Sequence, residues 1–228
     1  MFVRKFDRFF EFIRFAQAGI ISYMRIVIFG ASGRTGRHLV KQALDRGHAV
    51  TAFARNPAKI GVSHENLSIF KGDVLHPGEV DAAVRGQDAV LSALGLTKGS
   101  PKTICADGIR NIIATMKRHG VKRLIAESAY GAGNTRNKGF YARVLWLIIK
   151  DRIKDKEEME REIERSGLEW VIARPVALTD GEKTGSYRVG PDLKLSFFPR
   201  VSRADVADFM LSQLKSVEFV HGMPTVSF

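Results

Sequence analysis

Cysteine is almost absent from this sequence. The 228 residues include a single one, Cys105, so no disulfide can form within the chain. Structural disulfides belong to oxidising compartments, and their absence favours a reducing one. We therefore expect a cytoplasmic protein. Cys105 falls in a predicted helix, where a small buried hydrophobic residue is the better interpretation than a nucleophile.

Patterns typical of metal and nucleic-acid binding are also missing. The six histidines are scattered, without metal-ligand spacing, so we expect no metal site. No helix-turn-helix, zinc or RNA-binding motif accompanies the net charge of +12. We interpret this charge as a solvated basic surface that attracts anionic nucleotides, and we expect no nucleic-acid partner.

The first 23 residues lack the continuous apolar run of a secretory signal or a membrane span. They instead form an imperfect basic amphipathic helix, with phenylalanines on one side and arginines on the other. Three interpretations remain open. Residues 1–20 can make weak contact with a membrane surface, the segment can dock on the domain or on a second subunit, or the native chain can begin at Met24. We favour the last.

The most informative segment is MRIVIFGASGRTG, from Met24 to Gly36. An apolar strand runs into a turn with Gly30, Gly33 and Gly36, and a helix follows. Such glycines permit the turn, the approach of a pyrophosphate to bare backbone, and close packing of helix on strand. The helix N-terminus offers free N–H groups to phosphates. The segment therefore predicts a dinucleotide site, whose residues here are Gly30, Ser32, Gly33, Arg34, Thr35 and Gly36.

The second strand ends in arginine instead of an acidic residue. An NAD site commonly has Asp or Glu here, to accept hydrogen bonds from the ribose. Arg55 stands there, and a guanidinium matches the 2′-phosphate of NADP(H). Arg34 can supply a second cation. We therefore expect NADP(H) to be preferred over NAD(H).

Strands and helices alternate from residue 24 onward, which predicts a parallel sheet covered on both faces. We expect an α/β protein with a Rossmann-type doubly wound parallel sheet. Residues 24–228 would form this NAD(P)-binding domain, with a small irregular C-terminal substrate lobe near 176–203. The predicted strands are 25–29, 49–54, 67–70, 89–93, 123–126, 170–173 and 224–227, and the predicted helices are 36–46, 77–85, 103–118, 155–166 and 204–214.

Further candidate residues follow the later strands, at the sheet edge where ligands bind. Asp73 can accept a hydrogen bond from an adenine amino group, and Val74 offers a backbone N–H. The small-residue stretch Ala93, Leu94 and Gly95 leaves room for a ribose or pyrophosphate. Ser128 and Tyr130 come after the fifth strand, where a side chain can orient a substrate.

The G-x-x-G-x-x-G spacing resembles the short-chain dehydrogenase/reductase superfamily, in its extended and atypical branches. GDV after the third strand, SALG after the fourth, the strand-five serine, SGL at 166–168 and ARP at 173–175 occur in the same order in the atypical branch. The chain is similar to the NAD(P)H-binding, NmrA-like group, and most to its flavin reductase (biliverdin-IXβ reductase) type. This resemblance covers residues 24–227 and implies an NAD(P)H-dependent reductase.

The superfamily's usual catalytic pair is Tyr-x-x-x-Lys, in which the lysine holds the nicotinamide ribose and the tyrosine donates a proton. The resemblance places the lysine at Lys156, but Arg152 stands where the tyrosine belongs. A histidine found in flavin reductases of this type is replaced by Val176. Ser128 and Tyr130 remain to orient the substrate, and the aromatic, cationic segment 136–152 is either a substrate flap or a helix packed on the core.

Two functions are consistent with this pattern. Hydride transfer to a conjugated acceptor, such as a flavin, quinone or tetrapyrrole, needs mostly positioning and can take its proton from water. The alternative is a non-catalytic NADP(H) sensor of NmrA-like type, which the missing tyrosine favours. We expect a planar, flavin-like small-molecule substrate, and either a monomer or a dimer.

Overall fold

The structure, a computed structural model, describes residues 23–136, 146 and 148–228. The amphipathic helix expected over residues 1–23 lies almost entirely outside this range. Most of the segment 136–152, interpreted above as a flap, lies outside it as well.

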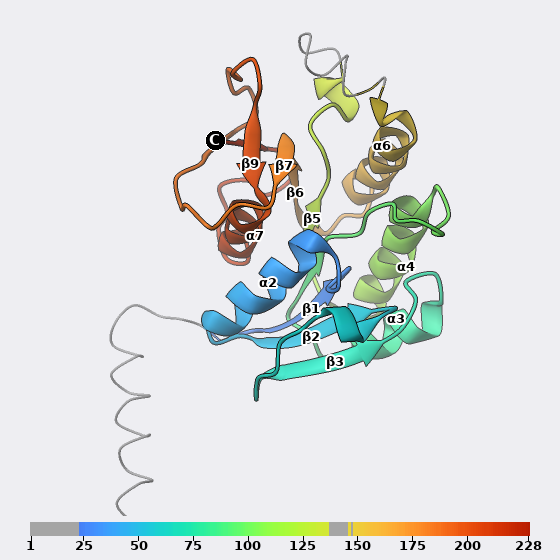
Figure 1. Ribbon diagram of the computed structural model, residues 1–228. Coiled ribbons are helices and arrows are strands. Elements are labelled where there is room, and N and C mark those ends of the chain that lie inside the picture. Colours follow the sequence, from blue (N-terminus) through green and yellow to red (C-terminus); the bar gives the residue numbers. More distant parts are fainter. Residues whose placement is uncertain (1–22, 137–145, 147) are drawn as a thin grey trace, which may run out of the picture.

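A mixed, mostly parallel sheet forms the centre of the protein (Figure 1). In the described part of the chain it has eight strands, in the order β3-β2-β1-β4-β5-β6-β10-β8. The chain order reverses between β1 and β4, which is the doubly wound topology predicted from the sequence. The strands are β1 (Arg25–Phe29), β2 (Ala49–Ala54), β3 (Leu67–Lys71), β4 (Ala89–Ser92), β5 (Arg123–Glu127), β6 (Glu169–Pro175), β8 (Arg188–Gly190) and β10 (Thr225–Ser227).

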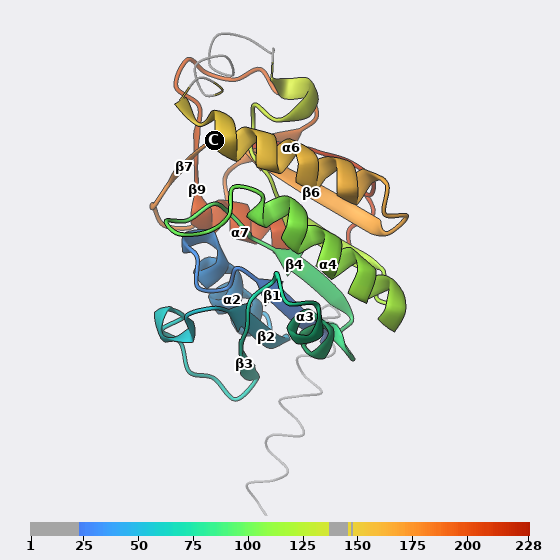
Figure 2. The same cartoon turned by 90° about the vertical axis from the view of Figure 1, so that its right-hand side faces the viewer.

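Helices cover both faces of this sheet (Figures 1 and 2). The helices α2 (Arg34–Asp45) and α7 (Arg203–Ser212) pack together on one face, and α3 (Pro77–Val84), α4 (Ile104–His119) and α6 (Lys150–Glu164) cover the other. Short 3-10 helices span Pro57–Lys59 and Gly133–Thr135. Among the described helices, none is both long and apolar enough to cross a bilayer.

Strand β1 explains why two cores form. Its side chains alternate between the faces, as strand geometry requires. Ile26 and Ile28 join the cluster under α2 and α7, whereas Val27 and Phe29 join the cluster under α3, α4 and α6. Because β1 is buried on both faces, its successive residues are all apolar after Arg25, which is the continuous run seen in the sequence.

The lobe is more regular than the sequence predicted. The strands β7 (Ala177–Thr179) and β9 (Arg200–Ser202) pair in parallel as a separate small sheet. The strand β8, between them in the chain, instead returns to the main sheet and pairs antiparallel with β10. With three residues each, β7, β8 and β9 show too little periodicity for their pairing to be predicted from the sequence.

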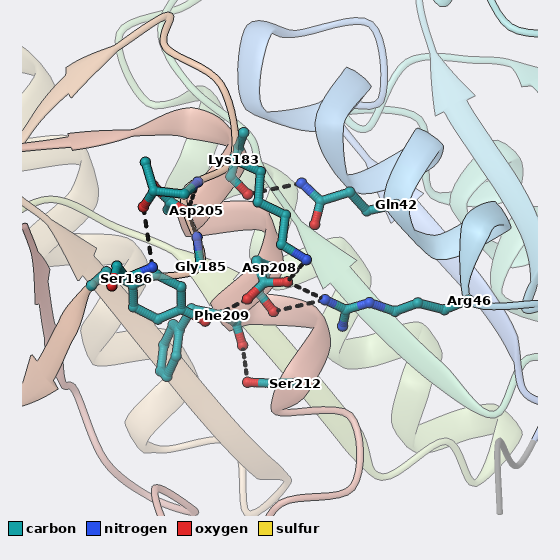
Figure 3. A network of polar contacts seen from close by, with 12 residues as sticks. Gln42, Arg46, Lys183, Gly185, Ser186, Asp205, Asp208, Phe209 and Ser212 are labelled. Carbon is teal, nitrogen blue, oxygen red and sulfur yellow. Dashed lines mark hydrogen bonds and ion pairs between the residues drawn. The ribbon is translucent and has the colours of Figure 1, made fainter. Parts of the chain in front are cut away.

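A polar network anchors the lobe to α7 and α2 (Figure 3). Asp208 of α7 is its centre, and its carboxylate lies 2.6 Å from Arg46 and 2.5 Å from Lys183. The hydroxyl of Tyr187 donates to the same carboxylate at 2.7 Å. Burial favours the neutral acid, but the hydrogen bonds from Lys183 and Tyr187 outweigh it and hold the pKa of Asp208 below its usual value. Asp208 is therefore ionised at neutral pH, and its contacts with Lys183 and Tyr187 of the lobe are made by a charged carboxylate.

We expect Asp208→Asn to lower the free energy of unfolding by about 1–3 kcal/mol at pH 7, because hydrogen bonds to a charged group are lost. The pKa of Asp208 is lower in the folded than in the unfolded state. The carboxylate therefore contributes its full stabilisation above about pH 4, and this stabilisation is lost as the pH falls through the folded-state pKa. Urea unfolding at pH 7 and pH 3 tests this. The difference from wild type should shrink at pH 3, whereas Asp45→Asn, at an exposed position of α2, should change little at either pH.

Candidate functional site

The glycine-rich turn has the backbone shape that its sequence requires. Gly30 has a φ of +77°, and a Cβ placed on it would lie 2.6 Å from the carbonyl oxygen of Ala93. Only glycine adopts this conformation readily. The N–H of Gly33 donates to the carbonyl of Gly30 at 2.9 Å and closes the turn. The turn thus lies against the end of β4, beside β1.

The turn places the N-terminus of α2, which no side chain caps, at the carboxyl edge of the sheet. Gly33 is the N-cap of α2, and no side chain caps the helix. A Cβ on Gly36 would lie 2.1 Å from the carbonyl oxygen of Gly30, so the first turn of α2 packs directly on the loop backbone. Uncapped N–H groups at the positive end of a helix dipole fit a diphosphate. Ser32, in the turn, is partly exposed, and Thr35 is buried.

The two predicted phosphate-binding arginines are both exposed. Arg55 follows β2, and its guanidinium donates to the hydroxyl of Thr97 at 3.1 Å. Arg34 begins α2 and lies 3.2 Å from the carboxylate of Asp180 in the lobe. Exposed pairs of this kind are weak, so these contacts can be exchanged for a stronger anion.

The candidates after β3 and β4 are partly engaged within the protein. The carboxylate of Asp73 accepts a hydrogen bond from the N–H of Leu75 at 3.0 Å. Val74 is buried, and its carbonyl accepts from the side chain of Asn111. The N–H of Ala93 donates to Phe29 and extends the ladder beyond β4.

The two candidates after β5 lie inside the protein. Ser128 is buried, and its Oγ has no hydrogen-bond partner among the described residues. Tyr130 is also buried and packs in the cluster beneath α2 and α7. Their predicted contact with a substrate therefore requires that the atoms covering them move. The N–H groups of Ser128 and Tyr130 donate to Ala173 and Pro175, which holds this segment against β6.

Lys156 reaches the sheet edge from α6. Its Nζ donates to the carbonyls of Leu94 at 2.6 Å and of Glu127 at 2.5 Å, which joins the ends of β4 and β5. Gly95, next to Leu94, is exposed. Arg152, one turn before Lys156, is exposed. The lysine therefore lies at the carboxyl edge of the sheet, and no tyrosine accompanies it on that turn of α6.

Two buried acids escaped the sequence interpretation. The carboxylate of Asp155 accepts from the N–H groups of Cys105 and Ala106 at 3.0 Å each, which ties the start of α4 to α6. Burial raises the pKa of the Cys105 thiol to about 12, so this cysteine is the inert buried residue we expected. Glu127, at the end of β5, accepts from the Thr35 hydroxyl at 3.0 Å. The signal available in the sequence was an acid directly after the apolar residues Leu124, Ile125 and Ala126 of β5.

Comparison with known proteins agrees with this geometry. The sequence profile of a family described as NAD(P)H-binding matches residues 30–216. The chain belongs to this NAD(P)H-binding family. Its members bind a nicotinamide dinucleotide, and an uncapped helix start such as that of α2 suits a diphosphate. The description of the family covers both NADH and NADPH.

Similar proteins from this comparison include YwnB of Bacillus subtilis, termed uncharacterized, which is 28% identical over 216 residues. That match covers 86% of this chain and 92% of YwnB. A Rossmann-fold NAD(P)-binding family protein from Shigella flexneri is 29% identical with a TM-score of 0.71, over 90% of this chain and 93% of that one. ChuY from Escherichia coli O157:H7, described as an anaerobilin reductase, has a TM-score of 0.75 at 22% identity, over 89% and 96% of the two chains. This last likeness concerns the fold.

Proposed function

We propose that this NAD(P)H-binding protein is an NADP(H)-dependent reductase, which passes hydride to a conjugated acceptor such as a flavin, a quinone or a tetrapyrrole. One observation carries the proposal. Lys156 is fixed across the ends of β4 and β5, on the same sheet edge as the uncapped start of α2. A dinucleotide whose diphosphate binds at α2 would extend its nicotinamide end toward this lysine.

The residues present fit such a cofactor. The main-chain N–H groups at Arg34 and Thr35 would hold the diphosphate, Arg55 the 2′-phosphate, and Lys156 the nicotinamide ribose. Asp73 and Val74 would contact the adenine, and the backbone at Ala93 and Leu94 would lie beneath the ribose. When bound, the reduced nicotinamide supplies the hydride. The task of the protein is to hold its ring against the acceptor and to exclude competing geometries.

The acceptor class follows from the missing acid. Arg152 occupies the tyrosine position and is exposed, so α6 offers no phenol beside Lys156. Reduction of a simple ketone develops alkoxide charge and benefits from a positioned proton donor. A conjugated acceptor spreads this charge and can be protonated by water. ChuY shares the fold and is named an anaerobilin reductase, which is in line with this chemistry.

The same absence supports a second candidate, a non-catalytic NADP(H) sensor. In this case the cofactor would bind as above, and the contact between Arg34 and Asp180 of the lobe would report its presence. One assay separates the two functions. Purified protein is mixed with NADPH and riboflavin phosphate, then with a quinone or a linear tetrapyrrole, and NADPH absorbance is followed. Oxidation above the spontaneous rate supports the reductase; NADPH binding without oxidation of any acceptor supports the sensor.

Arg55→Asp should weaken the binding of NADPH much more than that of NADH. Because the guanidinium is expected to pair with the 2′-phosphate, we expect the dissociation constant for NADPH to rise about 10- to 100-fold and that for NADH to change less than about threefold. Fluorescence titration with both coenzymes measures this. Lys59→Asp makes nearly the same change of charge at a nearby exposed position and should affect both equally. An equal loss for NADPH and NADH in Arg55→Asp would remove the phosphate contact from the account.

We also propose a planar small-molecule substrate, which follows from the acceptor class above. From the sequence we further propose a cytoplasmic location, a monomeric or dimeric state, and weak contact with a membrane surface through residues 1–20.

A further inference from the structure

A buried carboxyl group lies directly beneath the proposed diphosphate site. Glu127 ends β5 and is 7% exposed. Its Oε1 accepts the hydroxyl proton of Thr35 at 3.0 Å. Thr35 is the second residue of α2, so its backbone N–H belongs to the open helix end while its side chain points inward. One residue therefore separates the carboxyl from the place where the diphosphate would bind.

Cations surround this carboxyl without pairing with it. Lys156 of α6 donates to the main-chain carbonyl of Glu127, not to its carboxyl group. Arg203 of α7 pairs with Asp180 at 2.5 Å. From α4, the neighbouring titratable group is the neutral thiol of Cys105. In the described part of the chain, Thr35 is the hydrogen-bond donor to the carboxyl.

Such an environment favours the neutral acid. Removal from water penalises the carboxylate, and a single hydroxyl donor compensates poorly. Burial raises the pKa of Glu127 above its ordinary value, and Lys156, Thr35 and Arg203 offset the rise only in part. A diphosphate at the start of α2 would bring negative charge to the far side of Thr35. That charge would penalise the ionised form further.

We propose that binding of the dinucleotide is coupled to protonation of Glu127, so that the carboxyl carries a proton in the complex. The inference rests on the proposed function, because it requires a diphosphate at α2. Its balance is simple: one proton is taken from solvent when an ionised Glu127 becomes neutral, and it is returned on release of the dinucleotide. Glu127 is thus a positioning residue, which acts on the cofactor through Thr35.

Because binding takes up a proton, the affinity for the dinucleotide must fall as the pH rises. Between the pKa of Glu127 in the free protein and its higher value in the complex, the dissociation constant rises up to about tenfold per pH unit. Glu127→Gln keeps the acceptor for Thr35 and is always neutral. We expect this variant to bind the dinucleotide about as tightly as wild type does at low pH, and to lose the part of the pH dependence that Glu127 contributes.

Calorimetric titration with NADPH and with NADH, between pH 5 and pH 9 in two buffers of different ionisation enthalpy, counts the protons taken up. His38 and the 2′-phosphate of NADPH also titrate, but they contribute to both proteins, so the difference between wild type and Glu127→Gln isolates Glu127. We expect wild type to take up more protons than the variant within a window of pH. Equal proton uptake at every pH would overturn the inference and leave the proposed function intact, whereas no binding by wild type would overturn the proposed function itself.

Thr35→Val provides a second test of the proton coupling, in case Glu127→Gln does not fold. The valine is nearly isosteric and removes the hydrogen bond that favours the carboxylate. Its pH profile should therefore move to higher pH than that of wild type. Thr115→Val, at another buried threonine, in α4, should leave the profile unchanged. An unmoved profile in Thr35→Val would contradict the coupling.

Discussion

Gly36→Ala is expected to abolish binding of the dinucleotide. The added Cβ would lie 2.1 Å from the carbonyl oxygen of Gly30 and 2.9 Å from the Cα of Ala31. Both atoms are backbone, so α2 must move away from the loop that shapes its N-terminus. The N–H groups that would hold the diphosphate then lose their alignment. We expect the affinity for NADPH to fall about 100-fold or more and the free energy of unfolding to fall by about 1–3 kcal/mol through overpacking.

Gly78→Ala is the matched control. Gly78 lies in the first turn of α3, and a Cβ placed there would meet no atom within 4 Å. This substitution should leave binding unchanged and stability equal or slightly higher, since alanine favours the helix. Binding is measured by fluorescence titration with NADPH, and stability by urea unfolding. Normal NADPH affinity in Gly36→Ala would show that the start of α2 is not the phosphate site.

Glu160→Gln is expected to have the largest effect on stability. Glu160 of α6 accepts two hydrogen bonds from Arg174 of β6, each at 2.8 Å, and the two side chains are 3% and 4% exposed. Removing one partner leaves a buried charge unpaired, which costs about 3–5 kcal/mol. Lys156 lies one helical turn before Glu160, so loosening α6 should also weaken binding of the nicotinamide end.

Glu164→Gln makes the same chemical change at an exposed position of α6 and should lower stability by less than about 0.5 kcal/mol. Urea unfolding of both variants gives the comparison. Arg174 also donates a hydrogen bond to the side-chain oxygen of Asn134 at 2.5 Å, and this neutral amide cannot replace the lost charge. If Glu160→Gln unfolded with wild-type stability, the pair would not hold α6 on β6.

The sequence predicted the main sheet well because its signals are local. Apolar runs such as Ile26–Phe29 must be buried on both faces, and the glycines after them mark where the strand ends and the helix begins. The predicted start of α6 was late: the helix begins at Lys150 instead of 155. The charged residues before Asp155 obscured the helical period, whereas the structure shows Ile153 buried, as Met159 and Ile163 are.

The missed features depend on residues far apart in the chain. Glu127 and Thr35 are 92 positions apart, and Lys156 lies 62 positions from the carbonyl of Leu94. No local pattern encodes these contacts. The position of Lys156 was inferred from a family resemblance, but its carbonyl partners and the burial of Glu127 appear only once β4, β5, α2 and α6 converge at one edge of the sheet.

The most direct test of the account is a calorimetric titration of the folded full-length protein with NADPH and with NADH. The account predicts saturable binding of one dinucleotide per chain, with NADPH bound more tightly. Absence of saturable binding for both coenzymes, in protein shown to be folded by its cooperative unfolding, would contradict it.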